Sequence, residues 1–391
     1  MEKLDQTVAR IKDELVGIRR DLHRFPEVGF QEHRTAAKVA EYLNKQRLEV
    51  ATGIGGTGVI GLLRGKNPGP TIAFRVCLDA LAMDERSGVQ YASENDGVFH
   101  GCGHDGNMTM ALGAANVLSQ HRDWLSGNVK FIFQPSEEET GGAAEVIKAG
   151  GLKNPDVDAI ITPHNWPGFK EGVLVVKAGP VLASSDVFHL EVVGKPGHGA
   201  YPHLAVDPVV VAADVVSALQ RIASREIDPL KAVTITIGKI HGGTAVNIIP
   251  ETVSLDGTVR TFDPEVRDFI QGRIEEIVRG ITQAARANYK LVYNRIMPPV
   301  NNDERLASKV TRILRDAFEP DVVASEFTPE MGCEEFSLFQ QEVPGLFLFI
   351  GKDEEGRDIV PLHAPNYVFN DEILMNGVKA LCVIALGYPG S

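Results

Sequence analysis

One stretch of the chain reads Phe131-Ile-Phe-Gln-Pro-Ser-Glu137-Glu138-Glu139-Thr-Gly-Gly142. Its apolar first half predicts a buried strand that stops at Pro135, and three carboxylates follow directly. Open α/β sheets place their chemistry outside the carboxyl ends of the strands, so such a fold would hold a site here. Adjacent glutamates repel one another unless a cation or a shared proton compensates. Taken alone, the three acids favour a solvated acidic loop, and only histidine and cysteine partners elsewhere would indicate a metal site.

The segments around this stretch alternate between strand and helix patterns. This alternation is typical of an α/β domain with a largely parallel sheet that helices cover on both faces. Before residue 182, strands are predicted at 59–63, 71–76, 129–133 and 159–162, and helices at 4–24, 34–44, 107–118 and 143–149. The same pattern returns after residue 297, with helices at 304–318 and 371–386 and a strand at 346–350.

The pattern changes between residues 183 and 296. Strand and helix patterns follow one another there in the order βαββαβ, which is the order of a ferredoxin-like α+β unit. Such a unit can be inserted into a host domain at a surface loop. We therefore expect a discontinuous catalytic domain, residues 1–182 and 297–391, interrupted by an inserted dimerisation or lid domain at 183–296.

Composition narrows the classes of function. The 391-residue chain carries a net charge of −13, which argues against nucleic acid as a partner. No apolar run reaches the roughly 18 residues of a membrane span. The first residues lack the apolar segment of a signal peptide, and four cysteines in a long chain fit thiols or ligands better than disulfides. We expect a cytoplasmic protein with no membrane partner.

The sequence Cys102-Gly-His104 places a thiol and an imidazole two residues apart in a glycine-rich loop before a helix. A buried cysteine beside a structural histidine explains this motif equally well when it stands alone. The metal interpretation strengthens because His164 and His363 also lie at predicted strand ends or in adjacent loops. With Glu137 and Glu138, these side chains offer N, S and O ligands that suit zinc, manganese, cobalt or nickel. Their number favours two divalent ions per subunit.

The motifs, taken in order, resemble the family of N-acyl-amino-acid amidohydrolases that includes hippurate hydrolase and the plant auxin-conjugate hydrolases. This family is related to aminoacylase and to dinuclear metallopeptidases such as carboxypeptidase G. The resemblance covers essentially the whole chain. Its motifs are Arg20-Asp-Leu-His-Arg-Phe-Pro-Glu27, Cys102-Gly-His-Asp105, Phe133-Gln-Pro-Ser-Glu-Glu138, Gly197-His-Gly-Ala200 with Pro202-His203, Gly243-Thr-Ala-Val-Asn247, Met331-Gly332 with Glu334-Glu335-Phe336, and Pro361-Leu-His363.

The resemblance implies a role for each candidate residue of the catalytic domain. Cys102 would bridge two metal ions, and Glu137 would stay off the metals as general base and acid for a metal-bridging hydroxide that attacks an amide. Asp79 would orient a ligand from outside the ligand set. The remaining ligands would be His104, Glu138, His164 and His363.

Three residues of the insert would contact the substrate by the same resemblance: His198, Asn247 and Arg260. His198 would come from a partner subunit, so a homodimer or higher homo-oligomer is implied. Arg260 would pair with the free carboxylate of a small N-acyl amino acid or conjugate, a task suited to its planar fork. On their chemistry alone, His198 could be a surface residue, Asn247 an ordinary turn or strand residue, and Arg260 a solvated charge.

The chain departs from the family pattern at Cys77, Asn107 and Glu139, none of which removes a predicted ligand or the base. Three alternatives stay open at this point. The protein could be a dipeptidase or carboxypeptidase that uses the same metals, or a non-catalytic binding protein that keeps the fold. It could also be an amidase with Cys102 as the nucleophile, whose activity would survive chelators.

Overall fold

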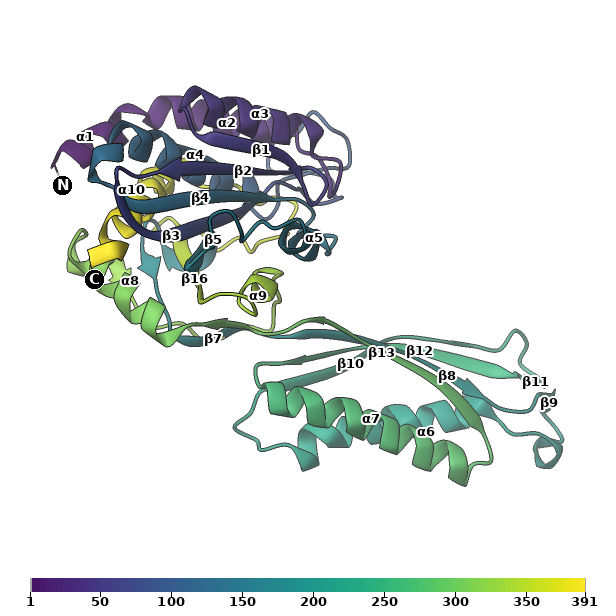
Figure 1. Cartoon of the computed structure of the whole chain (residues 1–391). Helices are drawn as coiled ribbons and strands as arrows, with labels where there is room; N and C mark the ends of the chain where they lie inside the picture. Colours follow the sequence, from purple (N-terminus) through teal and green to yellow (C-terminus); the bar gives the residue numbers. More distant parts are fainter. Residues whose placement is uncertain (1, 391) are drawn as a thin grey trace. The chain divides into compact units, whose positions relative to one another are not determined.

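The computed structural model of the chain describes residues 2–390, and these residues form two compact units (Figure 1). The smaller unit comprises Pro180–Val300 and the short segment Pro329–Glu334. The larger unit comprises the rest of the described chain, to which the backbone returns at Glu335. Each unit has its own hydrophobic core.

An eight-stranded sheet of order β1-β2-β4-β3-β5-β16-β6-β15 forms the base of the larger unit. The neighbours β4, β3, β5 and β16 run parallel, whereas β1 and β2 form an antiparallel margin beside β4. The predicted mixed α/β class with a largely parallel sheet is therefore confirmed. The strands are β1 (Glu49–Ile54), β2 (Gly58–Arg64), β3 (Asn67–Cys77), β4 (Ser126–Gln134), β5 (Ala159–Lys170), β6 (Leu174–Val175), β15 (Val323–Ala324) and β16 (Gly345–Asp353).

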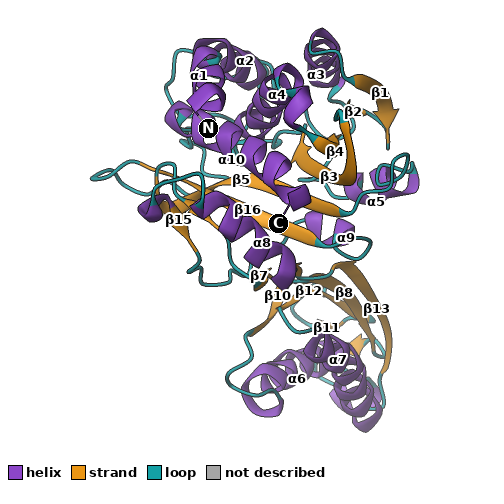
Figure 2. Cartoon of the chain, turned by 60° about the vertical axis from the view of Figure 1, so that its left-hand side comes forward, coloured by secondary structure: helices purple, strands orange, loops and turns teal. Residues whose placement is uncertain are grey.

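Most helices of the larger unit bury apolar side chains in one continuous core with this sheet. Figure 2 shows these helices beside the strands. The helix predicted from 4 to 24 is broken near Ile11 into two. The helix predicted from residue 107 begins three residues earlier, so His104 lies in its first turn after Gly103, whose φ of 79° suits glycine. The helices are α1 (Glu2–Arg10), α2 (Lys12–Arg24), α3 (His33–Lys45), α4 (His104–Gln120), α5 (Gly142–Lys148), α8 (Glu304–Arg315), α9 (Phe336–Phe339) and α10 (Leu374–Gly387).

The smaller unit has an antiparallel sheet of order β10-β12-β8-β13, with both α6 and α7 packed against it. Chain order and strand order together are those of a ferredoxin-like unit, which confirms the predicted insert fold. The elements are β8 (Ser185–Val193), α6 (Pro208–Arg221), β10 (Val233–Gly242), β11 (Ile248–Ile249), β12 (Thr252–Thr261), α7 (Pro264–Ala284) and β13 (Asn288–Met297), with β9 (Gly197–His198) paired to β11.

Two further short strands lie at the ends of the insert and pair with each other: β7 (Gly179–Leu182) and β14 (Val300–Asn302). No helix within residues 2–390 combines the length and the apolar character that a membrane crossing requires.

Candidate metal centre

The carboxyl ends of the parallel strands bring the candidate ligands of the larger unit together. β3 ends at Cys77 just before Asp79, and β4 ends at Gln134 just before the glutamates. The strand predicted to stop at residue 162 is longer than expected: β5 continues to Lys170, because β16 pairs with it beyond the point where β3 leaves. His164 consequently projects from within a strand and not from the loop after it.

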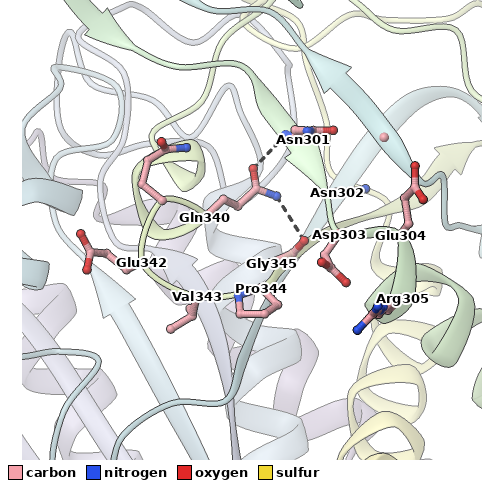
Figure 3. Close-up of a pocket in the computed structure, with 12 residues that line it drawn as sticks. Asn301, Asn302, Asp303, Glu304, Arg305, Gln340, Glu342, Val343, Pro344 and Gly345 are labelled. Carbon is pink, nitrogen blue, oxygen red and sulfur yellow. Dashed lines mark hydrogen bonds between the residues drawn. The ribbon is translucent and has the colours of Figure 1, made fainter. Parts of the chain in front are cut away.

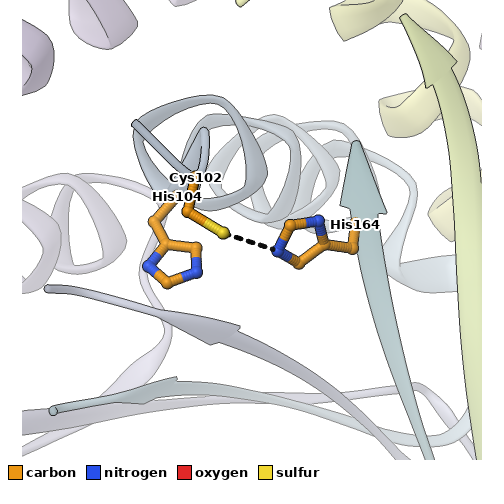
Figure 4. Close-up of side chains that lie close together, drawn as sticks. All are labelled: Cys102, His104 and His164. Atoms are coloured by element: carbon orange, nitrogen blue, oxygen red, sulfur yellow. Dashed lines mark hydrogen bonds between the residues drawn. The ribbon is translucent and has the colours of Figure 1, made fainter. Parts of the chain in front are cut away.

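Cys102, His104 and His164 form the first group of potential ligands (Figure 4). Their Sγ and ring nitrogen atoms all lie within 4.8 Å of one another, and Cys102 Sγ is 3.6 Å from His164 Nε2. All three side chains are buried. A buried trio of one thiol and two imidazoles offers the ligand types that zinc and neighbouring transition metals prefer.

Glu138 and His363 extend this group. Potential ligand atoms of Cys102, Glu138 and His363 lie within 4.8 Å of one another, as do those of His104, Glu137 and Glu138. Glu138 Oε1 is 3.4 Å from His363 Nε2. The loop of His363 is fixed to the Cys102 loop by a backbone hydrogen bond, from His363 N–H to the carbonyl of Gly101 at 2.9 Å. The five predicted ligands and Glu137 thus meet in one cluster.

The charges of the cluster fit a cation. Burial raises the pKa of the Cys102 thiol well above its ordinary value, and Glu138 and Glu137 raise it further. Burial also raises the pKa of Asp79 to about 6, helped by Glu138. Apart from its 3.4 Å contact with His363 Nε2, Glu138 Oε1 is buried without a hydrogen-bond partner among the residues described. The negative charges of Asp79, Glu138 and the Cys102 thiolate would repel one another at such short distances without a positive charge between them. The residues present therefore suit divalent metal.

Asp79 and His104 are tied together next to this cluster. His104 Nδ1 is 2.9 Å from the Asp79 carbonyl and 3.8 Å from Asp79 Oδ1. Asp79 Oδ2 accepts a hydrogen bond from the backbone N–H of Glu138 at 2.8 Å. The carboxylate therefore contacts two candidate ligands, which suits a residue that orients them. Cys77 lies near the same atoms and could form a group with Asp79 and His104.

Two buried acids to which the sequence analysis assigned no role hold the glutamate loop, which we define as residues 135–141. Glu32 accepts a hydrogen bond from the backbone N–H of Ser136 at 2.8 Å. Glu335 accepts one from Gly141 N–H at the other end of the loop, and both acids are buried. Neither acid lies near the loop in sequence, and no local pattern predicts either contact with the loop.

A hydrogen-bonded network supports the Cys102 loop from the side. Asn165 Nδ2 donates to the carbonyl of Cys102 at 2.9 Å, and Asn165 N–H donates to Asn107 Oδ1 at 3.1 Å. The hydroxyl of Tyr367 donates to Asn165 Oδ1. Asn107, noted from sequence only as a departure, is thus a buried partner of the residue that follows His164.

His23 and Asp105 lie in a buried ionic network behind α4. His23 Nδ1 is 2.8 Å from Asp105 Oδ2, and its Nε2 is 3.2 Å from Glu85 Oε1. Arg19 Nη1 is 3.0 Å from Asp105 Oδ2. Burial opposes the charged imidazole, but Asp105 and Glu85 outweigh it and raise the pKa of His23 to about 9.

The His23 network predicts a loss of stability at alkaline pH. An unfolded histidine titrates near pH 6.5, so the contribution of His23 is complete below that pH and is lost as the pH rises through about 9. The loss has an upper limit of about 3 kcal/mol. Urea unfolding of metal-free protein at pH 7 and pH 9.5 measures it, and His23→Gln should flatten the dependence. If the free energy of unfolding changes equally with pH in wild type and in His23→Gln, the effect belongs to other groups.

The three candidate residues of the insert lie at two places within the smaller unit. His198 in β9 is paired with Ile248, and Gly199 N–H donates to the carbonyl of Asn247 at 2.8 Å, so His198 and Asn247 are neighbours. Arg260 lies near the far end of β12, eight residues beyond its start at Thr252. At about 3.3 Å per residue this is roughly 26 Å along the sheet.

A cleft of about 710 Å³ lies in the larger unit apart from the cluster (Figure 3). It is lined by segments around Asn301–Arg305 and Gln340–Gly345. Gly345 begins β16, so the cleft lies at the amino end of that strand, whereas the candidate ligands gather at the carboxyl ends. The amide of Gln340 is occupied by backbone hydrogen bonds, since its Oε1 accepts from Asn301 N–H and its Nε2 donates to the carbonyl of Gly345. We assign no chemistry to this cleft.

The fold and the side-chain cluster define a hydrolase of the metal-dependent class. The chain belongs to the peptidase family M20/M25/M40, whose model matches residues 73–386. It is 36% identical to thermostable carboxypeptidase 2 of Saccharolobus solfataricus, over 99% of this chain and 98% of that one. It is 37% identical to the N-acetyl-L-cysteine deacetylase of Bacillus subtilis, over 88% of this chain and 82% of that one.

A solved structure agrees with this family assignment. It is that of a dinuclear metal binding peptidase from Bacillus subtilis, which shares 32% sequence identity with the chain at a TM-score of 0.85. The similarity covers 97% of this chain and 99% of that one. The amidohydrolase family inferred from the sequence motifs is therefore confirmed.

Proposed function

We propose that the protein hydrolyses the amide bond of N-acyl amino acids or related amino-acid conjugates. Its family membership assigns the protein to the class of metal-dependent amidohydrolases. The observation that carries the proposal is the cluster of Cys102, His104, Glu138, His164 and His363, in which only His363 is exposed, with Glu137 beside it. The five side chains would hold two divalent cations, and the pair in the related peptidase supports this number. Manganese, zinc, cobalt and nickel all suit the ligand set.

Glu137 is the proposed proton carrier. Two divalent cations, when bound, would supply Lewis acidity and lower the pKa of a water molecule. The Glu137 carboxylate would accept a proton from the attacking water and deliver it to the departing amine nitrogen. Its neighbour Glu138 is a ligand in this proposal, and Asp79 orients Glu138 and His104 through the contacts described above.

The smaller unit is proposed to bind the substrate and to form a homodimer. Arg260 Nη1 is buried without a hydrogen-bond partner among the described residues, so a donor is available for a substrate carboxylate. His198 and Asn247 lie at the other end of the sheet, too far from Arg260 for one small substrate to touch all three within one subunit. This separation supports a second subunit as the source of His198, whose N–H would stabilise the oxyanion.

The four cysteines support a cytoplasmic location as part of this proposal. None of the four forms a disulfide bond within the described residues, although Cys77 and Cys102 lie close enough to affect each other electrostatically. Thiols persist in reducing compartments and tend to pair in oxidising ones.

A substrate panel tests the proposed function against the carboxypeptidase or dipeptidase alternative, which the similarity to a thermostable carboxypeptidase favours. Metal-loaded protein would be assayed with N-acetyl and N-benzoyl amino acids, with dipeptides, and with N-blocked dipeptides. We expect kcat/KM to be highest for the N-acyl amino acids. Faster turnover of free or blocked dipeptides would replace the proposal with the peptidase alternative, and no turnover of any amide would favour a binding protein.

The same panel tests Arg260. Its replacement in Arg260→Met should raise KM for N-acyl amino acids by about 10- to 100-fold, because a charged hydrogen-bonded pair contributes about 1.5–3 kcal/mol. The corresponding C-terminal amides lack the carboxylate, and their kinetic constants should change little. Arg225, an arginine of the same unit with no proposed role, provides the control variant Arg225→Met. An equal loss on acids and amides would contradict carboxylate binding by Arg260.

A further inference from the structure

Glu335 contacts the part of the glutamate loop that carries Glu137. The backbone N–H of Glu335 donates to Glu137 Oε1 at 3.3 Å. Its own carboxylate accepts hydrogen bonds from Gly141 N–H, from Ala143 N–H at 2.9 Å and from Gln134 Nε2 at 2.8 Å. One buried residue, Glu335, therefore forms hydrogen bonds both with the end of the loop and with the side chain of Glu137.

The carboxylate of Glu335 is itself fixed by a chain of buried hydrogen bonds. Gln134, which donates to it, accepts a hydrogen bond from Arg75 Nε at 2.8 Å through its Oε1. Arg75 and Gln134 are fully buried, and Glu335 is nearly so. A buried carboxylate with three donors cannot turn without leaving a charge or a donor unsatisfied, so the chain Arg75–Gln134–Glu335 is rigid.

We propose that Glu335 is a positioning residue for Glu137, which it fixes through its backbone N–H and through the end of the loop. The proposal rests on the proposed function, in which Glu137 transfers the proton. Proton transfer is sensitive to the placement of the carrier, and a misplacement of about 1 Å can cost ~100-fold in rate. The N–H of Glu335 occupies one oxygen of Glu137 and thereby sets the direction of the other.

Asp79 provides the matched comparison, because it holds the same loop at a different point. The Asp79 carboxylate accepts a hydrogen bond from the backbone N–H of Glu138 and lies 3.8 Å from His104 Nδ1, and both residues are candidate ligands. Glu335 contacts neither of them through any of its hydrogen bonds given above. Variants of the two acids should therefore differ: those of Asp79 should weaken metal binding, and those of Glu335 should lower kcat.

The experiment compares Glu335→Gln, Glu335→Asp and Asp79→Asn in the full chain. Metal affinity would be measured by calorimetric titration, together with kcat, KM and melting temperature. In Glu335→Gln one carbonyl-like acceptor becomes an N–H donor, so we expect kcat to fall about tenfold with KM and metal affinity within about twofold of wild type. Glu335→Asp keeps the charge and should recover most of kcat. Asp79→Asn should lose about 10- to 100-fold in metal affinity.

A double variant separates this proposal from the proposed function. With Glu137→Gln already present, Glu335→Gln should lower kcat no further, because both changes act on one group. Additive losses would overturn the positioning role, as would an unchanged kcat or a metal affinity that falls as in Asp79→Asn. If Glu335→Gln fails to fold, the smaller loss of kcat expected for Glu335→Asp, whose shorter side chain displaces the carboxylate, should likewise disappear in the Glu137→Gln background. Full activity of Glu137→Gln alone would instead refute the proposed base. The exposed Glu342→Gln should behave as wild type.

Discussion

Glu137→Gln should lower kcat by a factor of about 10²–10⁴ with little change in KM, because proton transfer by a positioned side chain is worth that much. The amide has the same shape as the carboxylate and still accepts the N–H of Glu335, but it cannot take up a proton. Metal content should remain at the wild-type level, since the proposed ligands are five other residues. Steady-state kinetics and elemental analysis of the same preparation provide both measurements.

The neighbouring Glu139→Gln is the control for Glu137→Gln. Glu139 is exposed and belongs to none of the groups of potential ligands within the described chain, so its variant should keep wild-type activity and metal content. If Glu137→Gln loses metal together with activity, Glu137 is a ligand and not the base. If it keeps wild-type kcat, proton transfer must be assigned elsewhere.

Removal of metal should abolish amide hydrolysis, and divalent ions should restore it. The side chains of the cluster suit divalent cations, and such cations would polarise the amide and activate the water. Cys102→Ala should reduce the bound metal and the activity together. Metal should also raise the melting temperature of wild type, since a ligand at 1,000 times its Kd stabilises the folded state by about 4 kcal/mol.

The nucleophile alternative makes the opposite prediction for the chelated protein. If Cys102 attacked the amide itself, activity would survive dialysis against a chelator, and a thiol reagent would inactivate the metal-free protein. Thiol modification of Cys102 alone cannot distinguish the two mechanisms, because a modified ligand loses metal as well. Cys333→Ser controls for modification elsewhere, since Cys333 is the most exposed of the four cysteines.

Local sequence was sufficient for the main features of the fold. Alternating strand and helix patterns predicted the largely parallel sheet, and the order βαββαβ predicted the insert, because hydrophobic periodicity follows from which face of each element is buried. Boundaries were less accurate. β5 is longer than its apolar run, since pairing with β16 extends it through His164. α4 begins at His104, since Gly103 can adopt the left-handed conformation before it.

The sequence by itself determined which residues could act in this protein: Cys102-Gly-His104, the paired Glu137 and Glu138, and two histidines near strand ends. Thiol, imidazole and carboxylate groups in short motifs keep their chemistry in any fold. Only the tertiary structure decided that these groups converge, and that Glu32, Asp79 and Glu335 hold the glutamate loop from three sides. These hydrogen bonds join residues 59, 104 and 194 positions apart, and they have no local pattern because they form only when packing brings distant segments together.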